Sequence, residues 1–222
     1  ISPSVVFFSL SILSFFVSII VYLNGLPKEL DFKGEGEKLK LPEKNVLIFG
    51  FLLFVIFGSN GIIIDWSALW FTKELYAPLH LASLGLIFLS LGGILANLFS
   101  NQLINLFSEK IVGCYFVIFG STLLFFSITQ LNFYFILITF FIYGFCSANL
   151  VPIIIRQAVK HSSESIPTTV TNLITMGFSA MLFAPAIIGF VAETFSLTTN
   201  MYALSVIVFI AGNIFLRQFR TN

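Results

Sequence analysis

Charge is what this sequence lacks most. Only 9% of its 222 residues are Asp, Glu, Lys or Arg, whereas a soluble globular domain has about 25%. Apolar residues make up 58% of the chain, Phe alone contributes 29 residues, and the mean hydropathy is +1.02. A chain of this composition has too few charged groups to solvate the surface of a globular fold. The sequence therefore predicts an integral protein of the lipid bilayer.

Other scarcities exclude several kinds of chemistry. The net charge is +1 and no basic patch is present, so we expect no nucleic-acid partner. Cys114 and Cys146 lie in apolar runs without metal-ligand spacing and are interpreted as small packing residues. His80 and His161 lie at the ends of predicted spans on opposite sides of the membrane, so they cannot share a site. No second carboxylate within a span pairs with Asp65 for acid–base catalysis. We expect no metal, no cofactor and no enzymatic activity.

Uncharged stretches define the transmembrane helices, since a helix that crosses a bilayer needs about 20 apolar residues. A polar cluster at residues 129–132 divides the longest such stretch into two. A hydrophilic loop with five Lys and five acidic residues covers residues 27–45, and residues 218–222 form a short tail. The sequence predicts an all-α integral membrane bundle of seven transmembrane helices, one within residues 1–26 and six within residues 46–217. The predicted spans are residues 3–23, 45–71, 79–103, 111–128, 133–155, 165–192 and 194–216.

The distribution of Lys and Arg predicts the orientation, because cytoplasmic loops are enriched in these residues. When residues 27–45 are placed in the cytoplasm, ten of the eleven Lys and Arg residues fall on the cytoplasmic side and Lys73 alone falls on the other. This places the N-terminus outside and the C-terminus in the cytoplasm. The first residue is Ile rather than Met, and we therefore expect the chain to be part of a longer protein with helices upstream.

Polar side chains are concentrated in four of the seven spans: the second, third, fifth and sixth. Amides and hydroxyls in a membrane need a partner or water, so their clustering predicts an aqueous cavity between these four spans. For any single Asn, a hydrogen bond to a neighbouring helix is the alternative explanation. Pro152 and Pro185 lie within apolar spans and predict kinks. Glycines at positions 85, 92 and 93 predict close helix packing. The candidate site residues are Asn60, Asp65, Trp66, Tyr143, Asn149, Thr171, Asn172 and Thr175.

Asp65 is the one carboxylate inside a predicted span. A charged side chain at a helix centre costs about 2.5–3.5 kcal/mol by insertion scales, so Asp65 should face a polar cavity or lie close to the membrane interface. It lies about 9–10 Å beyond the centre of its span at 1.5 Å per residue. Trp66 and Trp70 also fit an interfacial aromatic belt. Both locations remain open at this point.

Three stretches of this sequence resemble a known family. They are Asn60-Gly61 followed by Asp65-Trp66-Ser67, the Gly…Ala-Asn-x-x-Pro pattern of residues 144–152, and residues 171–197 with their Gly, Pro and Ala-Glu positions. Together they are similar to the C-terminal half of a major facilitator superfamily transporter of the MosC-like group. The resemblance covers residues 46–217, and residues 1–45 match the sixth helix and the cytoplasmic loop between the halves. It implies helices six to twelve of a twelve-helix fold, with helices seven, eight, ten and eleven around the cavity.

Two positions depart from the pattern of this group. Asn60 stands where the group often has Glu, which argues against proton coupling through that position. Residues 97–103 lack the charges of the Gly-Asp-Arg-rich loop that usually follows the eighth helix. We therefore expect the gating ion pairs of that loop to be missing.

The resemblance implies secondary transport by alternating access in a bacterial inner membrane. The expected partners are a small solute that is sugar- or inositol-like, a coupling proton, the lipid bilayer and the N-terminal half of the same transporter. Asp65 would bind a cationic or hydroxyl group of the solute or take up the proton, and Trp66 and Tyr143 would offer stacking faces. Hydrogen bonds to the solute would come from Asn149, Thr171, Asn172 and Thr175.

Two alternative functions are weighed against transport. A transport-inactive or regulatory membrane protein of the same fold would explain both departures from the group's pattern. A seven-helix receptor matches the number and orientation of the spans. A retinal protein of that kind needs a Lys in its last span, and residues 196–216 contain none.

Overall fold

The computed structural model describes residues 3–24 and 42–219, and every element within these ranges is helical. Most of the expected loop at residues 27–45 and the last three residues of the expected tail lie outside them. Seven helical segments in the described residues are long and apolar enough to cross a membrane. The all-α, seven-span fold is therefore confirmed, and the protein is a multi-pass membrane protein. The segments are Val5–Leu23, Lys44–Lys73, Leu79–Leu98, Ser100–Gln130, Phe133–His161, Ile166–Thr194 and Leu197–Gln218.

The chain forms two compact units, residues 1–41 and residues 42–222. The first contains helix α1 (Pro3–Asn24), in which the side chains of residues 5–23 are exposed. Ser9, Ser11 and Ser18 each donate a hydroxyl hydrogen bond to the carbonyl four residues earlier. Bonding of this kind satisfies a hydroxyl within its own helix, so these three serines need no partner from elsewhere.

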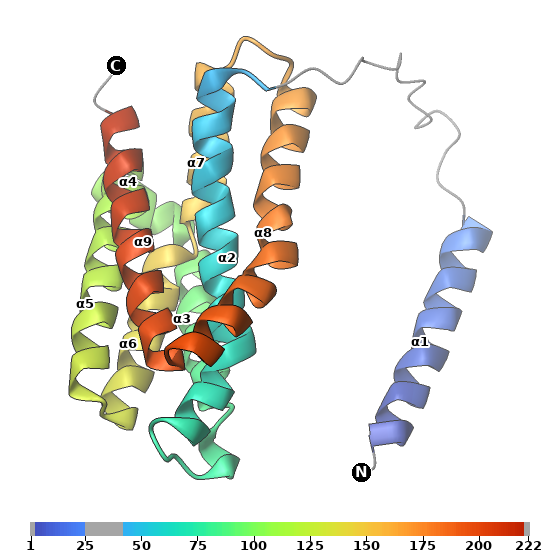
Figure 1. The fold of residues 1–222 in the computed structure, drawn as a ribbon. Coiled ribbons are helices and arrows are strands. Elements are labelled where there is room, and N and C mark those ends of the chain that lie inside the picture. The colour runs from blue at the N-terminus through green and yellow to red at the C-terminus, as the bar shows by residue number, and fades with distance from the viewer. Residues whose placement is uncertain (1–2, 25–41, 220–222) are drawn as a thin grey trace. The chain divides into compact units, whose positions relative to one another are not determined.

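The second unit is a bundle of the other six spans (Figure 1). Helix α2 packs against α3, α7, α8 and α9, and its buried face includes Phe49, Leu53, Ile63 and Trp70. A helix surrounded in this way brings its side chains into contact with most of the bundle. The elements of this unit are α2 (Lys44–Lys73), η2 (Leu79–Leu81), α3 (Leu84–Leu98), α4 (Ser100–Lys110), η3 (Ile111–Tyr115), α5 (Phe116–Gln130), α6 (Phe133–Ser147), α7 (Leu150–His161), α8 (Ile166–Thr194) and α9 (Leu197–Gln218).

Helices α3 and α6 touch through their backbones. A Cβ atom at Gly92 would lie 2.0 Å from the carbonyl oxygen of Phe141, and one at Gly144 would lie 2.1 Å from the carbonyl oxygen of Leu89. No side chain separates the two helices at these points. The close packing predicted for the glycines of the third span is confirmed at Gly92.

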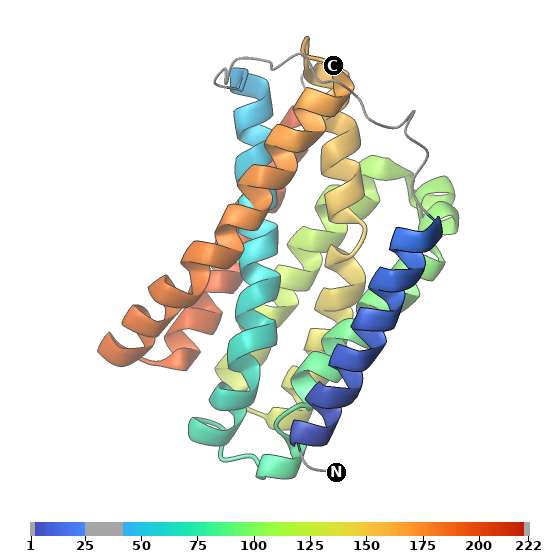
Figure 2. The ribbon, with the colours of Figure 1, turned by 90° about the vertical axis from the view of Figure 1, so that its right-hand side faces the viewer.

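The two prolines within spans act differently. The span of residues 133–161 is interrupted between α6 and α7 at Ala148 and Asn149, and Pro152 lies in the first turn of α7. Figure 2 shows this interruption between the yellow and light-orange parts of one column. Pro185 lies inside the continuous helix α8, which bends in its C-terminal half (Figure 1). Pro185 removes a backbone hydrogen bond from the interior of its helix, whereas Pro152 lies in a first turn, where the N–H group has no acceptor in the helix.

The segment that follows α3 corrects the sequence-based prediction. The third span ends at Leu98 rather than residue 103, and helix α4 occupies most of the expected loop. Leu103 and Ile104 pack against the core, whereas Asn101, Gln102 and Asn105 are exposed. Leu106 and Phe107 are exposed as well, so only part of the apolar surface of α4 packs against the bundle. A short π-helix, η3, then leads into α5.

Candidate functional site

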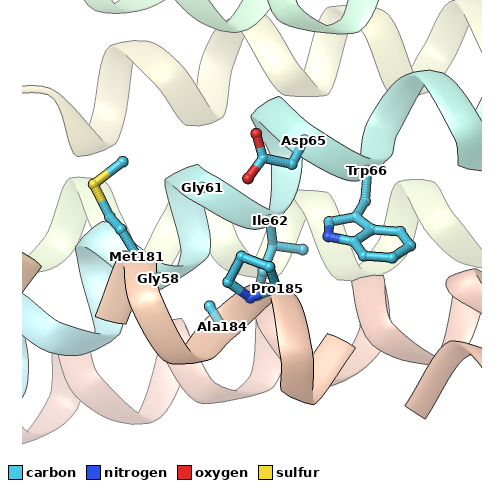
Figure 3. A pocket seen from close by; sticks show the side chains of 8 residues that line it. All are labelled: Gly58, Gly61, Ile62, Asp65, Trp66, Met181, Ala184 and Pro185. Atoms are coloured by element: carbon cyan, nitrogen blue, oxygen red, sulfur yellow. The ribbon is translucent and has the colours of Figure 1, made fainter. Parts of the chain in front are cut away.

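A small pocket lies where α2 crosses α8 (Figure 3). Its volume is about 50 Å³. Positions 58, 61, 62, 65 and 66 of α2 contribute to it, and residues three or four apart lie on one face of a helix. The lining residues are Gly58, Gly61, Ile62, Asp65, Trp66, Met181, Ala184 and Pro185.

Two glycines of α2 shape this pocket. A Cβ atom at Gly58 would lie 3.5 Å from the Cβ atom of Ala180, so α8 passes close to α2 at this level. A Cβ atom at Gly61 would meet no other atom within 4 Å, which shows that the space beside Gly61 is open. The pocket therefore lies next to the close contact at Gly58 and beside Pro185, in the part of α8 that bends.

Asp65 provides the charge of the pocket. Its side chain is exposed, and within the described ranges no hydrogen bond or ion pair to its carboxylate is found. Asp65 lies inside α2, where the backbone N–H groups bond to carbonyls four residues earlier. The carboxylate thus has no backbone donor of its own helix available, and in Figure 3 it extends beside Gly61.

The two tryptophans of α2 occupy different environments. The indole of Trp66 is partly buried and reaches α8, where its Cη2 atom would lie 3.7 Å from a Cβ atom at Gly189. Trp70 is fully buried, and its Nε1 atom donates a hydrogen bond of 2.8 Å to Thr198 Oγ1. Trp70 is therefore a core residue, and the interpretation as an interfacial belt residue remains open only for Trp66.

Tyr143 lies inside the bundle. Its side chain is fully buried, and its hydroxyl lies 3.0 Å from Ser59 Oγ. The Ser59 hydroxyl also donates to the carbonyl of Ile56, so the Tyr143 hydroxyl is the donor between the two. Tyr143 thus connects α6 to α2, and its expected role as a stacking face for a solute stays a prediction.

Asn149 is buried at the interruption between α6 and α7. Its Nδ2 atom donates a hydrogen bond of 3.1 Å to the carbonyl of Ala96 at the end of α3. Its Oδ1 atom is buried and has no partner in the described part of the chain. This is the interhelical hydrogen bond that the sequence offered as the alternative explanation for a single Asn.

Asp65 and Trp66 line the same pocket, whereas the polar residues of α8 lie at a different level along the bundle. The Met176 side chain packs on Gly50, so Thr175 lies near the level of Gly50. Asp65 follows Gly50 by 15 residues, which is about 22 Å along an α-helix. Thr171 and Thr175 are exposed, Asn172 donates to Glu164 Oε2 at 3.2 Å, and Asn60 is partly buried.

Several residues of the pocket and its surroundings were not identified from the sequence as site residues. Met181 and Pro185 come from α8, and only the register between α2 and α8 places them opposite Asp65. Glu109, at the end of α4, accepts hydrogen bonds from Arg156 Nη1 at 2.6 Å and from Gln157 Nε2 at 2.7 Å. This ion pair joins α4 to α7 although residues 97–103 carry no charge.

The fold and the pocket define a class: a multi-pass α-helical membrane protein with a charged pocket between two spans. Comparison with known proteins gives a more particular result. The chain is 28% identical over 198 residues to an uncharacterized MFS-type transporter of Yersinia pestis, a match that covers 85% of this chain and 50% of the relative. It is 29% identical over 157 residues to the membrane protein MosC of Rhizobium meliloti, which covers 68% of this chain and 37% of the relative.

These similarities confirm the resemblance to the major facilitator superfamily and its MosC-like group. The chain spans about half the length of the curated relatives it matches, or less. No family model matches the sequence. No solved structure matches it either. The seven-span, all-helical architecture is consistent with half of a major facilitator fold.

Proposed function

We propose that this chain is the C-terminal half of a secondary transporter that moves a small solute across a membrane by alternating access. The observation that carries the proposal is the exposed carboxylate of Asp65 in a pocket between two membrane-spanning helices. A charge within a span marks a functional site by default. The similarity to an MFS-type transporter supports the same class of function.

In this mechanism the solute binds between two six-helix halves, and rocking of one half against the other exposes it to alternate sides. Asp65 and Trp66 would contact the solute from the C-terminal half, and the second half would complete the cavity. A proton bound to Asp65 would neutralise its charge and couple the movement to a proton gradient. Asn60, Thr171, Asn172 and Thr175 are proposed to line the same route nearer the other end of the bundle.

The proposed location is a bacterial inner membrane with the Lys44 end of α2 in the cytoplasm. Asn45 donates a hydrogen bond of 3.2 Å to the carbonyl of His161, so the start of α2 lies beside the end of α7. Arg156 and Lys160 of α7 pair with Glu109, which precedes Lys110, and Arg217 lies in the last turn of α9. The positive-inside rule therefore supports this orientation.

The test is solute uptake by cells that express the gene encoding this chain, together with any coding sequence upstream in the same frame. We expect a labelled solute to accumulate, and Asp65→Asn to reduce accumulation at least tenfold while membrane insertion is unchanged. A Glu193→Gln variant removes a carboxylate outside the pocket and should transport normally. Equal uptake by Asp65→Asn and the unmodified protein would contradict the role of Asp65. Absence of uptake for a broad set of solutes would favour a transport-inactive protein of the same fold.

A further inference from the structure

The chemistry of the pocket narrows the class of ligand. We infer that the pocket formed by Asp65, Trp66 and the bend of α8 binds a small organic cation, a substituted ammonium group, rather than a neutral polyol. This inference rests on the proposed function, because it names the kind of solute that the same pocket would recognise.

Asp65 places a negative charge in the pocket. In the parts of the chain that the structure describes, neither a cation nor a neutral donor contacts its carboxylate. The neighbouring backbone N–H groups are committed to the hydrogen bonds of α2. Asp65 lies within a membrane-spanning helix, where a carboxylate is costly unless a partner compensates it, and a ligand that carries a positive charge would provide one.

The other walls of the pocket are largely apolar. Apart from Asp65, its side chains come from Ile62, Trp66, Met181, Ala184 and Pro185. The indole N–H of Trp66 is their only conventional hydrogen-bonding group. A sugar or inositol carries several hydroxyls, and each hydroxyl that leaves water without a partner costs free energy. These walls therefore do not suit the sugar- or inositol-like solute that the resemblance implies.

A substituted ammonium group matches both features. Its positive charge would lie beside the Asp65 carboxylate, and its methyl or methylene groups would contact the apolar walls. The indole of Trp66 can add a cation–π interaction, for which Trp is the best aromatic residue. The thioether of Met181 is polarisable and adapts to irregular ligands.

The size of the pocket is consistent with a head group. A volume of about 50 Å³ exceeds several times the roughly 10–15 Å³ needed for one water molecule. The pocket therefore accommodates a small ammonium group, and the remainder of a larger solute would extend into the open space beside Gly61.

The chain contains only two Trp residues, Trp66 and Trp70, which allows a direct binding assay. Trp70→Phe leaves Trp66 as the single fluorescent indole, next to Asp65. The experiment titrates this variant, in a neutral detergent, with tetramethylammonium chloride. Sodium chloride at equal ionic strength and myo-inositol serve as comparison ligands. Circular dichroism and gel filtration establish that each variant is folded.

We expect a saturable change in Trp66 emission with tetramethylammonium and none with sodium chloride or myo-inositol. Asp65→Asn should weaken the apparent affinity at least tenfold, Asp65→Glu should retain it within about tenfold, and Glu193→Gln should leave it unchanged. An equal response in Asp65→Asn would overturn the inference, as would the same response to sodium. So would binding of myo-inositol without binding of the ammonium ion.

The result is separable from the uptake experiment. Ammonium binding without uptake of any solute would leave the cation pocket in place and remove the transport proposal. Uptake of a neutral solute without an ammonium response would support the transport proposal and overturn the cation pocket.

Discussion

Glu74, just after the end of α2, holds Thr198 in the first turn of α9. Its Oε2 atom accepts hydrogen bonds from the backbone nitrogen of Thr198 at 2.8 Å and from Thr198 Oγ1 at 2.6 Å. Its Oε1 atom accepts another from the backbone nitrogen of Leu197 at 2.6 Å. The carboxylate thereby satisfies two free N–H groups at the start of a helix, where a negative charge is favourable.

Glu74→Gln should destabilise the bundle by about 1–2 kcal/mol. The amide has one acceptor oxygen instead of two and carries no charge, so at least one donor of α9 would lose a charge-assisted hydrogen bond. The measurement is thermal or denaturant unfolding in detergent micelles. Glu193→Gln, an exposed carboxylate near the end of α8, is the matched control and should change stability little. Equal stability of both variants would show that the contact contributes nothing.

A second prediction concerns the contact between α3 and α6. Gly92→Ala should destabilise the protein by about 3 kcal/mol or more, because the new methyl group would lie 2.0 Å from the carbonyl oxygen of Phe141 and a backbone atom cannot move without displacing its helix. Gly61→Ala is the matched control. Its methyl group would meet no atom within 4 Å, and Ala is favoured over Gly inside a helix by about 0.5–1 kcal/mol.

Thermal stability in detergent distinguishes these two substitutions by the sign of the change. We expect a large decrease for Gly92→Ala and no decrease for Gly61→Ala. A Gly92→Ala protein as stable as the unmodified one would show that α3 and α6 do not touch through their backbones.

A third prediction concerns Ser108, because its backbone conformation is strained. Its φ is 72° and its ψ is 156°, a region that only glycine adopts without strain, and it forms a kink inside α4, two residues before this helix ends at Lys110. Ser108→Gly should therefore stabilise the protein, by about 1 kcal/mol. Ser90→Gly, at an exposed position inside α3, should destabilise it by about 0.5–1 kcal/mol. If both substitutions lowered the unfolding temperature, the turn at Ser108 would not have this geometry.

The number and order of the spans followed from the sequence, because their length and lack of charge depend only on local composition. Pro152 and Gly92 were also identified, because proline and glycine act on the backbone wherever they occur. Helix α4 was not identified, since its apolar residues are too few to stand out from a loop between two spans. The environments of Tyr143 and Asn149 were not predictable either. Whether a polar side chain faces a cavity or a neighbouring helix depends on the register between helices, which one sequence does not specify.

The start of α2 makes a prediction about pH. The side-chain hydroxyl of Ser163 donates a hydrogen bond to the Glu43 carboxylate, and its backbone nitrogen donates another at 3.2 Å. These bonds hold the pKa of Glu43 below its ordinary value of 4.5, first through the hydroxyl and then through the backbone amide. A lowered pKa in the folded state means that the contribution to stability is complete above the unfolded pKa. It is lost as the pH falls through the folded pKa.

The unmodified protein should therefore gain more stability than Glu43→Gln when the pH is raised from about 3 to about 6. Unfolding temperatures of both proteins across this range provide the measurement. Glu164 accepts a hydrogen bond from the Glu43 backbone nitrogen at 3.2 Å, so Glu164→Gln serves to separate its titration from that of Glu43. The same pH dependence with and without the Glu43 carboxylate would exclude its contribution.

The buried pair of Tyr143 and Ser59 separates a structural role from a binding role. Their hydroxyl oxygens are 3.0 Å apart inside the contact between α6 and α2, and hydrogen bonds between membrane helices contribute about 0.6 kcal/mol on average. Tyr143→Phe and Ser59→Ala should each lower stability by about 0.5–1.5 kcal/mol. The double variant should lose less than the sum, because both substitutions remove the same bond. Additive losses would show that the bond contributes nothing. A Tyr143→Phe protein with normal stability and weakened solute binding would instead support the role of Tyr143 as a contact of the solute.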